Sequence, residues 1–535
     1  MPVEHDLADL VAEAAAERPD ALAIVEAGGR RLSWAGLEDE VGRIATGLGS
    51  AGIVAGQRVA LAVGNRSEFV TTYLGVLRAQ AVAVPVNPRA TVDELARMIA
   101  DSGSRLVVAD PSTLGAVRDA VDTVRKAVDG AGAGLDEDLV ARAVAVRVVV
   151  IDADARDDEL AYERLRAHPA EQVPPLLDPE KLATLLYTSG TSGRPRAAML
   201  THRALLANLD QVAAVEPPMI RADDVVLGVL PLFHVYGLNA VLGGVLKHRA
   251  RLVLVDRFDP QVTLDLIDDE ACSVVPVAPA VFAHWLPQDH LADRLGSVRL
   301  MLSGSAPLSP DLIDRFTSRT SIPIHQGYGL TEAAPVVTST LCSERLQAGS
   351  VGAALPGIEV RLVDEFGREP EGEDPGEIQL RGANLFSGYW PDGSDGPDDD
   401  GWWPTGDVGF LDSAGDLFLV DRVKELIIVS GFNVYPSEVE DVVREVPGVA
   451  EAAVIGVEDE LTGEAVVAYV RAEPGADPVT VEDACRRHCE TRLARFKWPS
   501  RIEVVAELPL TVTGKVQKGR LRGIERRRAL GLLEE

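Results

Sequence analysis

Apolar residues near the start of the chain alternate between a spacing typical of helices and short runs typical of buried strands. The helical spacing predicts helices over residues 7–17, 37–51 and 69–79. The short runs predict strands over residues 21–25, 31–33, 58–62 and 82–86. The first two of these strands are close enough to form a hairpin. Because strands and helices alternate, the pattern favours an α/β fold with a parallel sheet.

The same alternation returns later in the chain and then changes. A second series of apolar runs predicts strands over residues 225–230, 251–255, 273–277 and 298–302. From about residue 352 the pattern predicts a more antiparallel, β-rich piece, with strands over residues 359–364, 377–381 and 417–421. An alanine-rich, polar segment at about 112–145 has glycines at its centre and predicts an inserted, peripheral helical pair.

The last part of the chain predicts a compact α+β unit. Its expected helices cover residues 437–445, 481–493 and 518–528, and its expected strands cover residues 451–457, 465–470 and 501–505. A chain of 535 residues is too long for a single hydrophobic core. We therefore predict a large N-terminal domain, residues 1–421, of stacked α/β sheets with a β-rich subdomain at about 352–421. A small α+β domain, residues 422–535, completes the expected fold.

Charge and cysteine content narrow the function classes. The formal net charge is −31, which disfavours nucleic acid and anionic membranes as partners. No signal peptide or membrane-spanning run is evident, so we expect a cytoplasmic protein without integral membrane association. Cys485, His488 and Cys489 could share one helix face, but the further ligands of a zinc site are absent and we expect reduced thiols. The acidic run at 391–401 lacks the spacing of a calcium loop and is expected to be solvated.

The most informative stretch is residues 187–202, which read YTSGTSGRPRAAMLTH. Glycines let successive backbone N–H groups converge, and hydroxyl and guanidinium groups add donors suited to phosphate oxygens. A strand at 183–187, this loop and a helix beginning near Thr201 together predict an anion-binding site, although the Walker spacing is absent. A glycine-rich surface turn is the alternative for the loop taken alone. The residues concerned are Thr188, Ser189, Gly190, Thr191, Ser192, Gly193 and Arg196.

A second motif, QGYGLTE at 326–332, follows a strand-like run. Tyr328 lies between two glycines, Gly327 and Gly329, and can expose a flat ring for stacking on a base. Thr331 offers a hydroxyl group and Glu332 a carboxylate for a hard cation such as Mg²⁺. A turn with a packed tyrosine is the structural alternative, and the phosphate-type loop makes the functional interpretation the stronger one.

Three shorter segments offer further chemistry. Gly304, Ser305 and Ala306 form a turn after the strand at 298–302, where doubly wound sheets place ligands. Asp407 follows a tight Trp-Pro-Thr-Gly turn, and Lys515 follows a glycine in a loop. Considered alone, an aspartate in a turn or an exposed lysine is usually only solvated.

Taken in order, these motifs resemble those of the adenylate-forming superfamily, which includes acyl-CoA synthetases, luciferases and peptide-synthetase adenylation domains. The resemblance runs from Leu7 to about Glu525. The motif SGFNVYP at 430–436 is most similar to that of bacterial medium- or long-chain fatty acyl-CoA synthetases. It implies that a carboxylic acid attacks ATP to give an acyl-adenylate and pyrophosphate, and that CoA then displaces AMP. Mg²⁺ is the implied cofactor, with ATP and CoA as co-substrates.

The resemblance also implies roles for single residues. Tyr328 would stack on adenine, Thr331 would touch the α-phosphate, and Glu332 would hold Mg²⁺. The turn Gly304–Ala306 would border the adenine and the acyl pocket, with His234 as a gate or carboxylate neighbour. The ribose would be bound by Asp407 and Arg422.

The C-terminal domain would be mobile and would complete two different sites. Lys424 sits where the family keeps a hinge residue, and hinges absorb large backbone changes at few positions. Lys515 would serve adenylate formation by contacting the carboxylate and the α-phosphate. Ser430, Gly431 and Phe432 would line the CoA tunnel used in thioester formation.

Two departures from the family pattern keep alternatives open. Arg196 and Ala197 stand where the family usually has lysine and glycine, so a non-catalytic paralogue that binds nucleotide or acyl ligand remains one alternative. A fatty acyl-AMP ligase that loads a carrier protein is another. Phe233 and His234 replace the aspartate that pairs an amino group, which disfavours amino-acid substrates. Fatty acids are expected first and aryl acids second, and a homodimer is left open.

Overall fold

The computed structural model describes the chain apart from short segments. The described residues are 6–130, 135–171, 173–174, 178–188, 195–306, 308, 310–364, 366–370, 372, 374–422, 425, 427–429, 432–459, 462–493, 495–511 and 514–529. By their contacts the residues fall into two units, which are described separately. Unit 1 comprises Met1–Gly190, Pro195–Glu359 and Arg381–Trp402, and unit 2 comprises Thr191–Arg194, Val360–Leu380 and Trp403–Glu535. The domain boundary expected at residues 421 and 422 stays a prediction.

Unit 1 is built on two seven-stranded sheets. The first sheet has the order β7-β6-β5-β3-β4-β8-β9, and its strands are β3 (Arg58–Ala62), β4 (Val82–Pro85), β5 (Ser104–Ala109), β6 (Arg147–Val150), β7 (Leu160–Ala161), β8 (Leu182–Thr188) and β9 (Arg196–Thr201). The second has the order β14-β13-β12-β10-β11-β1-β2, and its strands are β1 (Leu22–Glu26), β2 (Arg31–Ser33), β10 (Val225–Gly228), β11 (Arg251–Leu254), β12 (Val274–Val277), β13 (Leu300–Ser303) and β14 (Ile324–Gln326). Most neighbours in each sheet are parallel, and β2 and β9 are the antiparallel edge strands.

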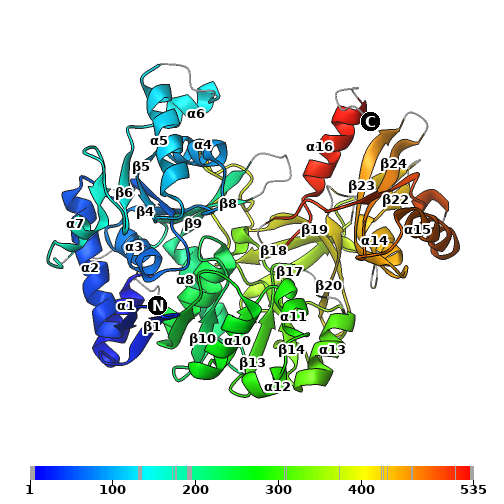
Figure 1. The fold of residues 1–535 in the computed structure, drawn as a ribbon, viewed down its shortest axis with the longest axis horizontal. Coiled ribbons are helices and arrows are strands. Elements are labelled where there is room, and N and C mark those ends of the chain that lie inside the picture. Colours follow the sequence, from blue (N-terminus) through cyan, green and yellow to red (C-terminus); the bar gives the residue numbers. More distant parts are fainter. Residues whose placement is uncertain are drawn as a thin grey trace. The chain divides into compact units, whose positions relative to one another are not determined.

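Helices cover both faces of these sheets (Figure 1). They are α1 (Asp9–Glu17), α2 (Trp34–Ser50), α3 (Ser67–Arg78), α4 (Val92–Ser102), α5 (Leu114–Val128), α6 (Glu137–Arg142), α7 (Tyr162–Arg166), α8 (His202–Ala213), α9 (Gly244–His248), α10 (Pro260–Asp269), α11 (Pro279–Trp285), α12 (Leu291–Arg294) and α13 (Pro310–Thr320), with a π-helix η1 (Tyr236–Gly243) and a 3₁₀ turn η2 (Thr331–Ala333). Because α2 contacts β1 and β2, α3 contacts β3 and β4, and α2 packs on α3, these two helices lie between the sheets.

The outer helices complete two hydrophobic cores. Helices α4 and α5 pack on the first sheet through a core that includes Leu95, Ile99 and Val121. Helices α10, α11 and α13 pack on the second sheet around Trp285 and Phe316, both fully buried. The segment at 112–145 was expected to be peripheral, but the buried face of α5 belongs to the first core. Its apolar residues recur at helical spacing, which is why the sheet covers them.

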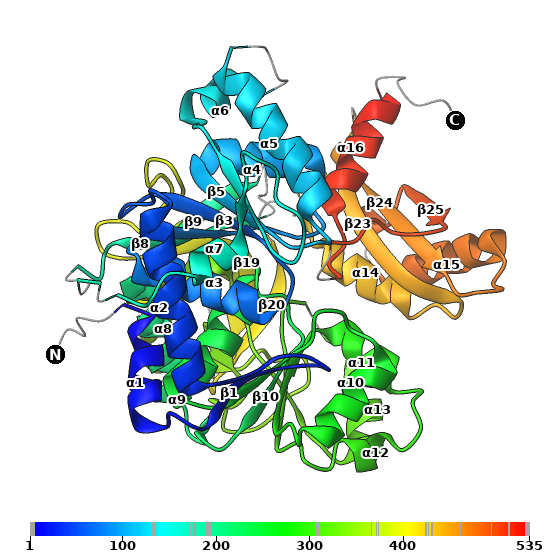
Figure 2. The same cartoon turned by 60° about the vertical axis from the view of Figure 1, so that its left-hand side comes forward.

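Unit 2 contains two smaller sheets. The first is antiparallel where its strands pair, with the order β17-β18-β19-β20, and comprises β17 (Ile358–Val363), β18 (Gly376–Gly382), β19 (Trp403–Leu411) and β20 (Leu417–Arg422). The second comprises β21 (Ile427–Val429), β22 (Phe432–Val434), β23 (Val449–Asp459), β24 (Gly463–Ala472) and β25 (Arg501–Val505). Helices α14 (Pro436–Arg444) and α15 (Pro478–Arg492) pack through one core, and α16 (Lys518–Ala529) packs through another, on the opposite side of the sheet (Figure 2).

The observed elements confirm the predicted fold class, with α/β sheets in a large part of the chain and an α+β arrangement near its C-terminus. Two short strands, β15 (Thr338–Ser339) and β16 (Ala353–Ala354), form a separate ribbon in unit 1. Within the described part of the chain, no helix is both long and apolar enough to span a bilayer.

One buried histidine links the start of the chain to α8. The side chain of His202 is buried, and its Nδ1 accepts a hydrogen bond from the backbone N–H of Leu7 at 3.2 Å. Burial lowers the pKa of His202 to about 4. Burial also raises the pKa of the nearby Asp6 to about 6. When the pH falls, His202 therefore lowers the stability of the folded chain and Asp6 raises it.

We predict that His202→Gln makes stability less sensitive to acid. In the unfolded wild-type chain the imidazole of His202 takes up a proton below a pKa of about 6.5. In the folded chain the same imidazole takes up a proton only near pH 4. Acid therefore lowers the stability of the wild type. The variant lacks this loss, while the opposite contribution of Asp6 is common to both proteins. Between pH 7.5 and 4.5 the wild type should lose about 2–3 kcal/mol relative to the variant, measured by urea denaturation. Parallel stability curves would contradict this assignment.

Candidate functional site

Three of the predicted motifs lie at one edge of the second sheet of unit 1. Strands β10, β12, β13 and β14 are parallel, so their carboxyl ends share this edge. His234 follows β10, the turn Gly304–Ala306 follows β13, and the segment Tyr328–Glu332 follows β14. Ligands of open α/β sheets bind at such carboxyl edges. The topology therefore brings together residues that the sequence separates widely.

The phosphate-type loop connects two strands rather than a strand and a helix. Strand β8 ends at Thr188 and pairs antiparallel with β9, with Thr188 opposite Arg196. The helix expected near Thr201 begins at His202, where the Thr201 side chain caps it by accepting from Ala204 N–H at 3.1 Å. The predicted start of this helix is confirmed to within one residue, but strand β9 lies between the loop and the helix, because the apolar residues 197–200 continue the sheet. The loop residues Ser189, Gly190, Thr191, Ser192 and Gly193 lie outside the described residues.

Buried amide side chains hold the turn that contains Tyr328, Thr331 and Glu332. Asn239 in η1 donates from Nδ2 to the carbonyl oxygens of Leu205 and Ala334, at 3.0 and 2.7 Å. Asn384 donates to the carbonyl of Ala333 at 2.7 Å. Asn208 donates to the carbonyl of Val336 at 2.8 Å and accepts from its N–H at 3.1 Å. The peptide groups around the turn are thereby paired although they are buried.

The glycines on either side of Tyr328 are required by close backbone contacts. A Cβ atom on Gly327 would lie 2.6 Å from the carbonyl oxygen of Thr338, and one on Gly329 would lie 2.4 Å from that of Pro335. The ring of Tyr328 is only 7% exposed. Positions 327 and 329 therefore allow a tight packing that alanine would disrupt.

Glu332 is a buried carboxylate with a defined partner. It is 8% exposed, and its Oε1 accepts a hydrogen bond from the Tyr389 hydroxyl at 2.6 Å. The guanidinium carbon of Arg196 lies 3.8 Å from the centre of the Tyr389 ring, and Arg196 also pairs with Asp395 at 2.7 Å. The structure therefore joins Arg196, Tyr389 and Glu332 into one contiguous group within unit 1.

The loop that carries His234 is tied to the other sheet of unit 1. Asn65 follows β3 and donates to the carbonyl of Leu230 at 2.8 Å, while its Oδ1 accepts from Leu232 N–H at 2.9 Å. His234 Nδ1 accepts from the backbone N–H of Tyr236 at 3.4 Å. A Cβ on Gly304 would meet the Tyr236 ring at 2.7 Å, so glycine allows this ring to lie against the turn after β13. Ser305 in that turn has a positive φ of 75°.

Unit 2 contains the predicted ribose pair. Asp407 lies in β19 and is directly opposite Arg422 in β20. The tight turn expected before Asp407 is an irregularity within β19, where the register with β18 shifts between Pro404 and Val408 and Gly406 has a positive φ of 73°. Asp407 is 8% exposed, and its N–H donates to Thr405 Oγ1 at 3.0 Å.

Some of the remaining predicted residues of unit 2 belong to the described part of the chain and some do not. Lys424, Ser430 and Gly431 lie outside the described residues, and Phe432 begins β22. Lys515 is exposed and lies in a turn closed by a bridge between Leu510 and Val516. Its N–H donates to Thr511 Oγ1 at 3.0 Å.

The helix after Lys515 is anchored by ion pairs inside unit 2. Lys518 contacts Glu425 at 3.0 Å and Glu440 at 2.8 Å. Arg528 at the other end of α16 contacts Glu503 at 2.9 Å. These contacts and the buried Leu521 hold α16 in place, so the turn containing Lys515 leads into a helix whose position is fixed.

The donor set at Glu332 suits a cation that takes most of its ligands from a nucleotide. No group of three or more His, Cys, Asp or Glu residues that could hold a metal occurs among the described residues. Mg²⁺ is commonly bound by one or two carboxylates together with phosphate oxygens. A single buried carboxylate fits that arrangement. Cys485 and Cys489 are free and buried, and burial raises the pKa of each thiol to about 11, as expected for inert thiols.

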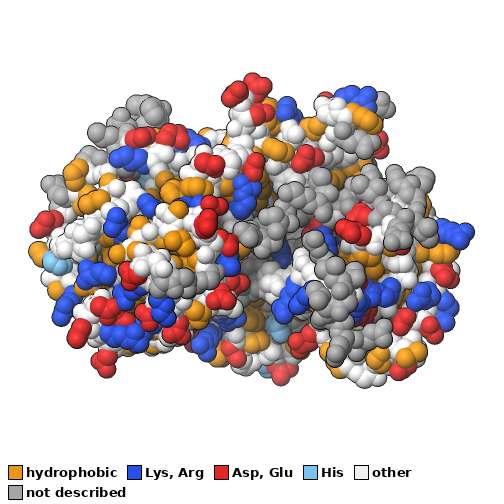
Figure 3. Space-filling view, turned by 90° about the horizontal axis from the view of Figure 1, so that it is seen from above, with side chains coloured by type: hydrophobic (Ala, Val, Ile, Leu, Met, Phe, Trp, Pro, Cys, Tyr) orange, Lys and Arg blue, Asp and Glu red, His pale blue; other side chains and the backbone are white. Residues whose placement is uncertain are grey.

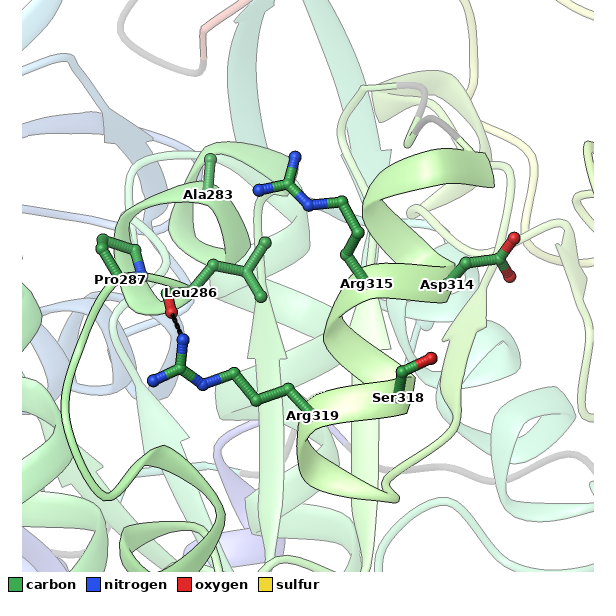
Figure 4. Close-up of a pocket in the computed structure, with 7 residues that line it drawn as sticks. All are labelled: Ala283, Leu286, Pro287, Asp314, Arg315, Ser318 and Arg319. Carbon is green, nitrogen blue, oxygen red and sulfur yellow. Dashed lines mark hydrogen bonds between the residues drawn. The ribbon is translucent and has the colours of Figure 1, made fainter.

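A separate surface pocket lies between α11 and α13 (Figure 4). Arg319 donates there to the carbonyl of Leu286, and Arg315 pairs with Asp311 at 3.5 Å. None of the predicted motif residues lines this pocket. On the face drawn in Figure 3, acidic and basic side chains of the described residues are interspersed.

Sequence reasoning assigned no role to six residues that organise the site: Asn65, Asn208, Tyr236, Asn239, Asn384 and Tyr389. Tyr236 and Asn239 lie in a π-helix, a rare element that often marks functional sites. The only local signal for Tyr389 is its place after a glycine, in Ser-Gly-Tyr-Trp. Its contacts with Arg196 and Glu332 depend on tertiary structure.

Comparisons with known proteins show the family to which the chain is similar. A family model described as AMP-binding enzyme matches residues 11–390, and one described as AMP-binding enzyme C-terminal domain matches residues 438–515. A long-chain-fatty-acid–CoA ligase of Bacillus subtilis is 32% identical over 96% of this chain and 94% of its own. A 4-coumarate–CoA ligase of Oryza sativa subsp. japonica is also 32% identical, over 98% of this chain and 95% of its own.

Solved structures give the same picture. ATP-bound MatB from Rhodopseudomonas palustris has a TM-score of 0.84 and 32% identity, with 98% of this chain and 99% of that chain covered. The Mycobacterium tuberculosis fatty acyl CoA synthetase has a TM-score of 0.74 and 29% identity, with 98% and 99% covered.

We predict that Asn239→Leu destabilises unit 1. Leucine has a similar size but cannot donate to the buried carbonyls of Leu205 and Ala334. Loss of a buried partner costs about 1–3 kcal/mol. Gln288→Leu is the matched control, because its amide makes one exposed hydrogen bond, and it should change the free energy of unfolding by less than about 0.5 kcal/mol. Equal effects of the two substitutions in urea denaturation would show that the amide at 239 does not hold the turn.

Proposed function

Since the chain belongs to the adenylate-forming family of acyl- and aryl-CoA ligases, we propose that it activates a medium- or long-chain fatty acid with ATP and transfers it to CoA. The resemblance indicated by the motifs is thus confirmed at the level of the family. The observation that carries the proposal is the buried Glu332 carboxylate, held in a turn beside Tyr328 at the carboxyl edge of a parallel sheet. This is the place and the chemistry that a magnesium–nucleotide complex requires.

In the first half-reaction the acid's carboxylate attacks the α-phosphorus of ATP, and pyrophosphate leaves. Bound Mg²⁺ would neutralise charge on the phosphates. The loop at 188–193 and Arg196 would bind the triphosphate, Tyr328 the adenine and Thr331 the α-phosphate. Gly304, Ser305 and Ala306 would border the nucleotide, with Gly329 beside the adenine ring. Asp407 and Arg422 would bind the ribose, and their cross-strand pairing supports a joint role.

In the second half-reaction the CoA thiol attacks the acyl carbon, and AMP leaves. Movement about Lys424 would replace the turn containing Lys515 by the face containing Ser430, Gly431 and Phe432. His234 would stand near the carboxylate of the acid. Since conformational steps can complete an active site in stages, one chain can provide two constellations in turn.

The acid is the least constrained part of the proposal. Relatives named for fatty acids and for 4-coumarate are equally similar to this chain, at 32% identity. The motif SGFNVYP at 430–436 supports an alkyl rather than an aryl acid as the substrate. CoA-dependent thioester formation with a panel of alkyl and aryl acids tests the choice. A product formed only with aryl acids would overturn the fatty-acid assignment and keep the reaction type.

The same panel tests the reaction type. Pyrophosphate release without CoA-dependent AMP release would indicate an acyl-AMP ligase that uses another acceptor. Absence of pyrophosphate release with every acid would contradict an enzymatic role and favour a binding protein.

We predict that Lys515→Ala nearly abolishes adenylate formation. A preorganised charge that meets two approaching anions is worth about 10²–10³ in rate. Pyrophosphate release should fall by about that factor, whereas thioester formation from supplied acyl-adenylate and CoA should remain. Lys126→Ala, which removes an exposed lysine from α5, serves as control and should leave both half-reactions unchanged. Wild-type adenylation in the Lys515 variant would remove this residue from the mechanism.

A further inference from the structure

The segment from Phe386 to Trp390 joins the two nucleotide motifs of unit 1. Its backbone continues the first sheet beyond β9, because Met199 N–H donates to the carbonyl of Gly388 at 3.1 Å and Trp390 N–H donates to that of Ala197 at 2.9 Å. At its other end Phe386 N–H donates to the carbonyl of Glu332 at 2.9 Å. One short segment is thus bonded both to the strand that leaves the phosphate-type loop and to the proposed metal ligand.

The path of this segment is tightly determined. Gly388 has a φ of 93°, and a Cβ there would lie 2.0 Å from the carbonyl oxygen of Gly393. Tyr389 forms backbone bridges with Ala198 on one side and Ser394 on the other. The Phe386 ring meets the Tyr389 ring edge to face at 5.0 Å. The position of Tyr389 is therefore set by the backbone before its side-chain contacts are considered.

The two polar contacts of Tyr389 run in different directions. Its ring receives the Arg196 guanidinium on one face, at 3.8 Å, and its hydroxyl donates to Glu332 at 2.6 Å. Arg196 is fixed in turn by Asp395 at 2.7 Å.

We propose that Tyr389 is a positioning residue for the nucleotide-bound divalent cation. Its hydroxyl fixes the Glu332 carboxylate, and its ring couples this carboxylate to Arg196. The inference rests on the proposed function, because it takes Glu332 as the cation's ligand. A donor on Oε1 limits rotation of the Glu332 carboxylate. Outer partners of metal ligands act in this way in other sites. The planar guanidinium explains why arginine suits position 196, since it can stack on the ring.

The direct test is cation binding by Tyr389→Phe. Phenylalanine keeps the ring for Arg196 and removes only the hydroxyl. Mn²⁺ binding is measured by electron paramagnetic resonance in the presence of α,β-methylene-ATP, so that no turnover and no acid are required. We expect Mn²⁺ affinity to fall about tenfold or more, as for other outer partners of metal ligands. Affinity for the nucleotide in EDTA should stay within about twofold of the wild-type value, because the hydroxyl is assigned only to Glu332.

Tyr162→Phe is the matched control. The Tyr162 hydroxyl is buried in unit 1 and bonds to Thr71 at 2.8 Å, away from the candidate site. Its loss should leave Mn²⁺ affinity unchanged. Wild-type Mn²⁺ affinity in folded Tyr389→Phe, or an equal loss in both variants, would overturn the proposal. If wild-type protein binds neither the nucleotide nor Mn²⁺ with it, the proposed function itself fails.

A double-mutant cycle tests the coupling to Arg196. Arg196→Lys keeps the charge beside the phosphate-type loop but loses the planar contact with the ring. We expect it to weaken Mn²⁺ binding in the wild-type background and to have little further effect once Tyr389 is phenylalanine. Additive effects of the two substitutions would refute transmission through Tyr389.

Discussion

Burial of the turn between β14 and β15 is the constraint on which the candidate site depends. The turn carries Tyr328, Thr331 and Glu332, and its residues 332–335 are buried, where each unpaired peptide group is costly. Amide side chains from α8, η1 and the segment after β18 pair with them. Removal of one of these donors would leave a buried carbonyl group unpaired. The position of Glu332 therefore depends on amide side chains from three other segments of the chain.

The sequence predicted the sheets well, because buried parallel strands are short apolar runs. Strands β3 and β25 have the predicted bounds, and the second series of runs became β10 to β13. Strand β9 was missed, since alanines have no strand signal of their own and the strand depends on pairing with β8. The Pro-Thr-Gly before Asp407 predicted a turn, and the structure has an irregularity at this place that neighbouring strands keep within β19.

The motif residues were recognisable, but the contacts between them were not. Tyr389 and Glu332 are 57 residues apart, and nothing in the spacing of QGYGLTE indicates a partner for its glutamate. Likewise, no pattern in η1 distinguishes a π-helix from an α-helix before the structure is known. Side chains that position others are selected by tertiary geometry, so a sequence reveals them less readily than it reveals ligand-binding motifs.

The candidate residues are divided between the two units. Unit 1 contains the residues assigned to adenine, phosphate and cation, whereas Asp407, Arg422 and Lys515 belong to unit 2. Within unit 2 the turn of Lys515 is closed by its own bridge and continues into a helix anchored through Lys518. Glu425, one partner of Lys518, is next to the proposed hinge residue. In the proposed function Lys515 would therefore move together with α16 and the sheet on which this helix packs.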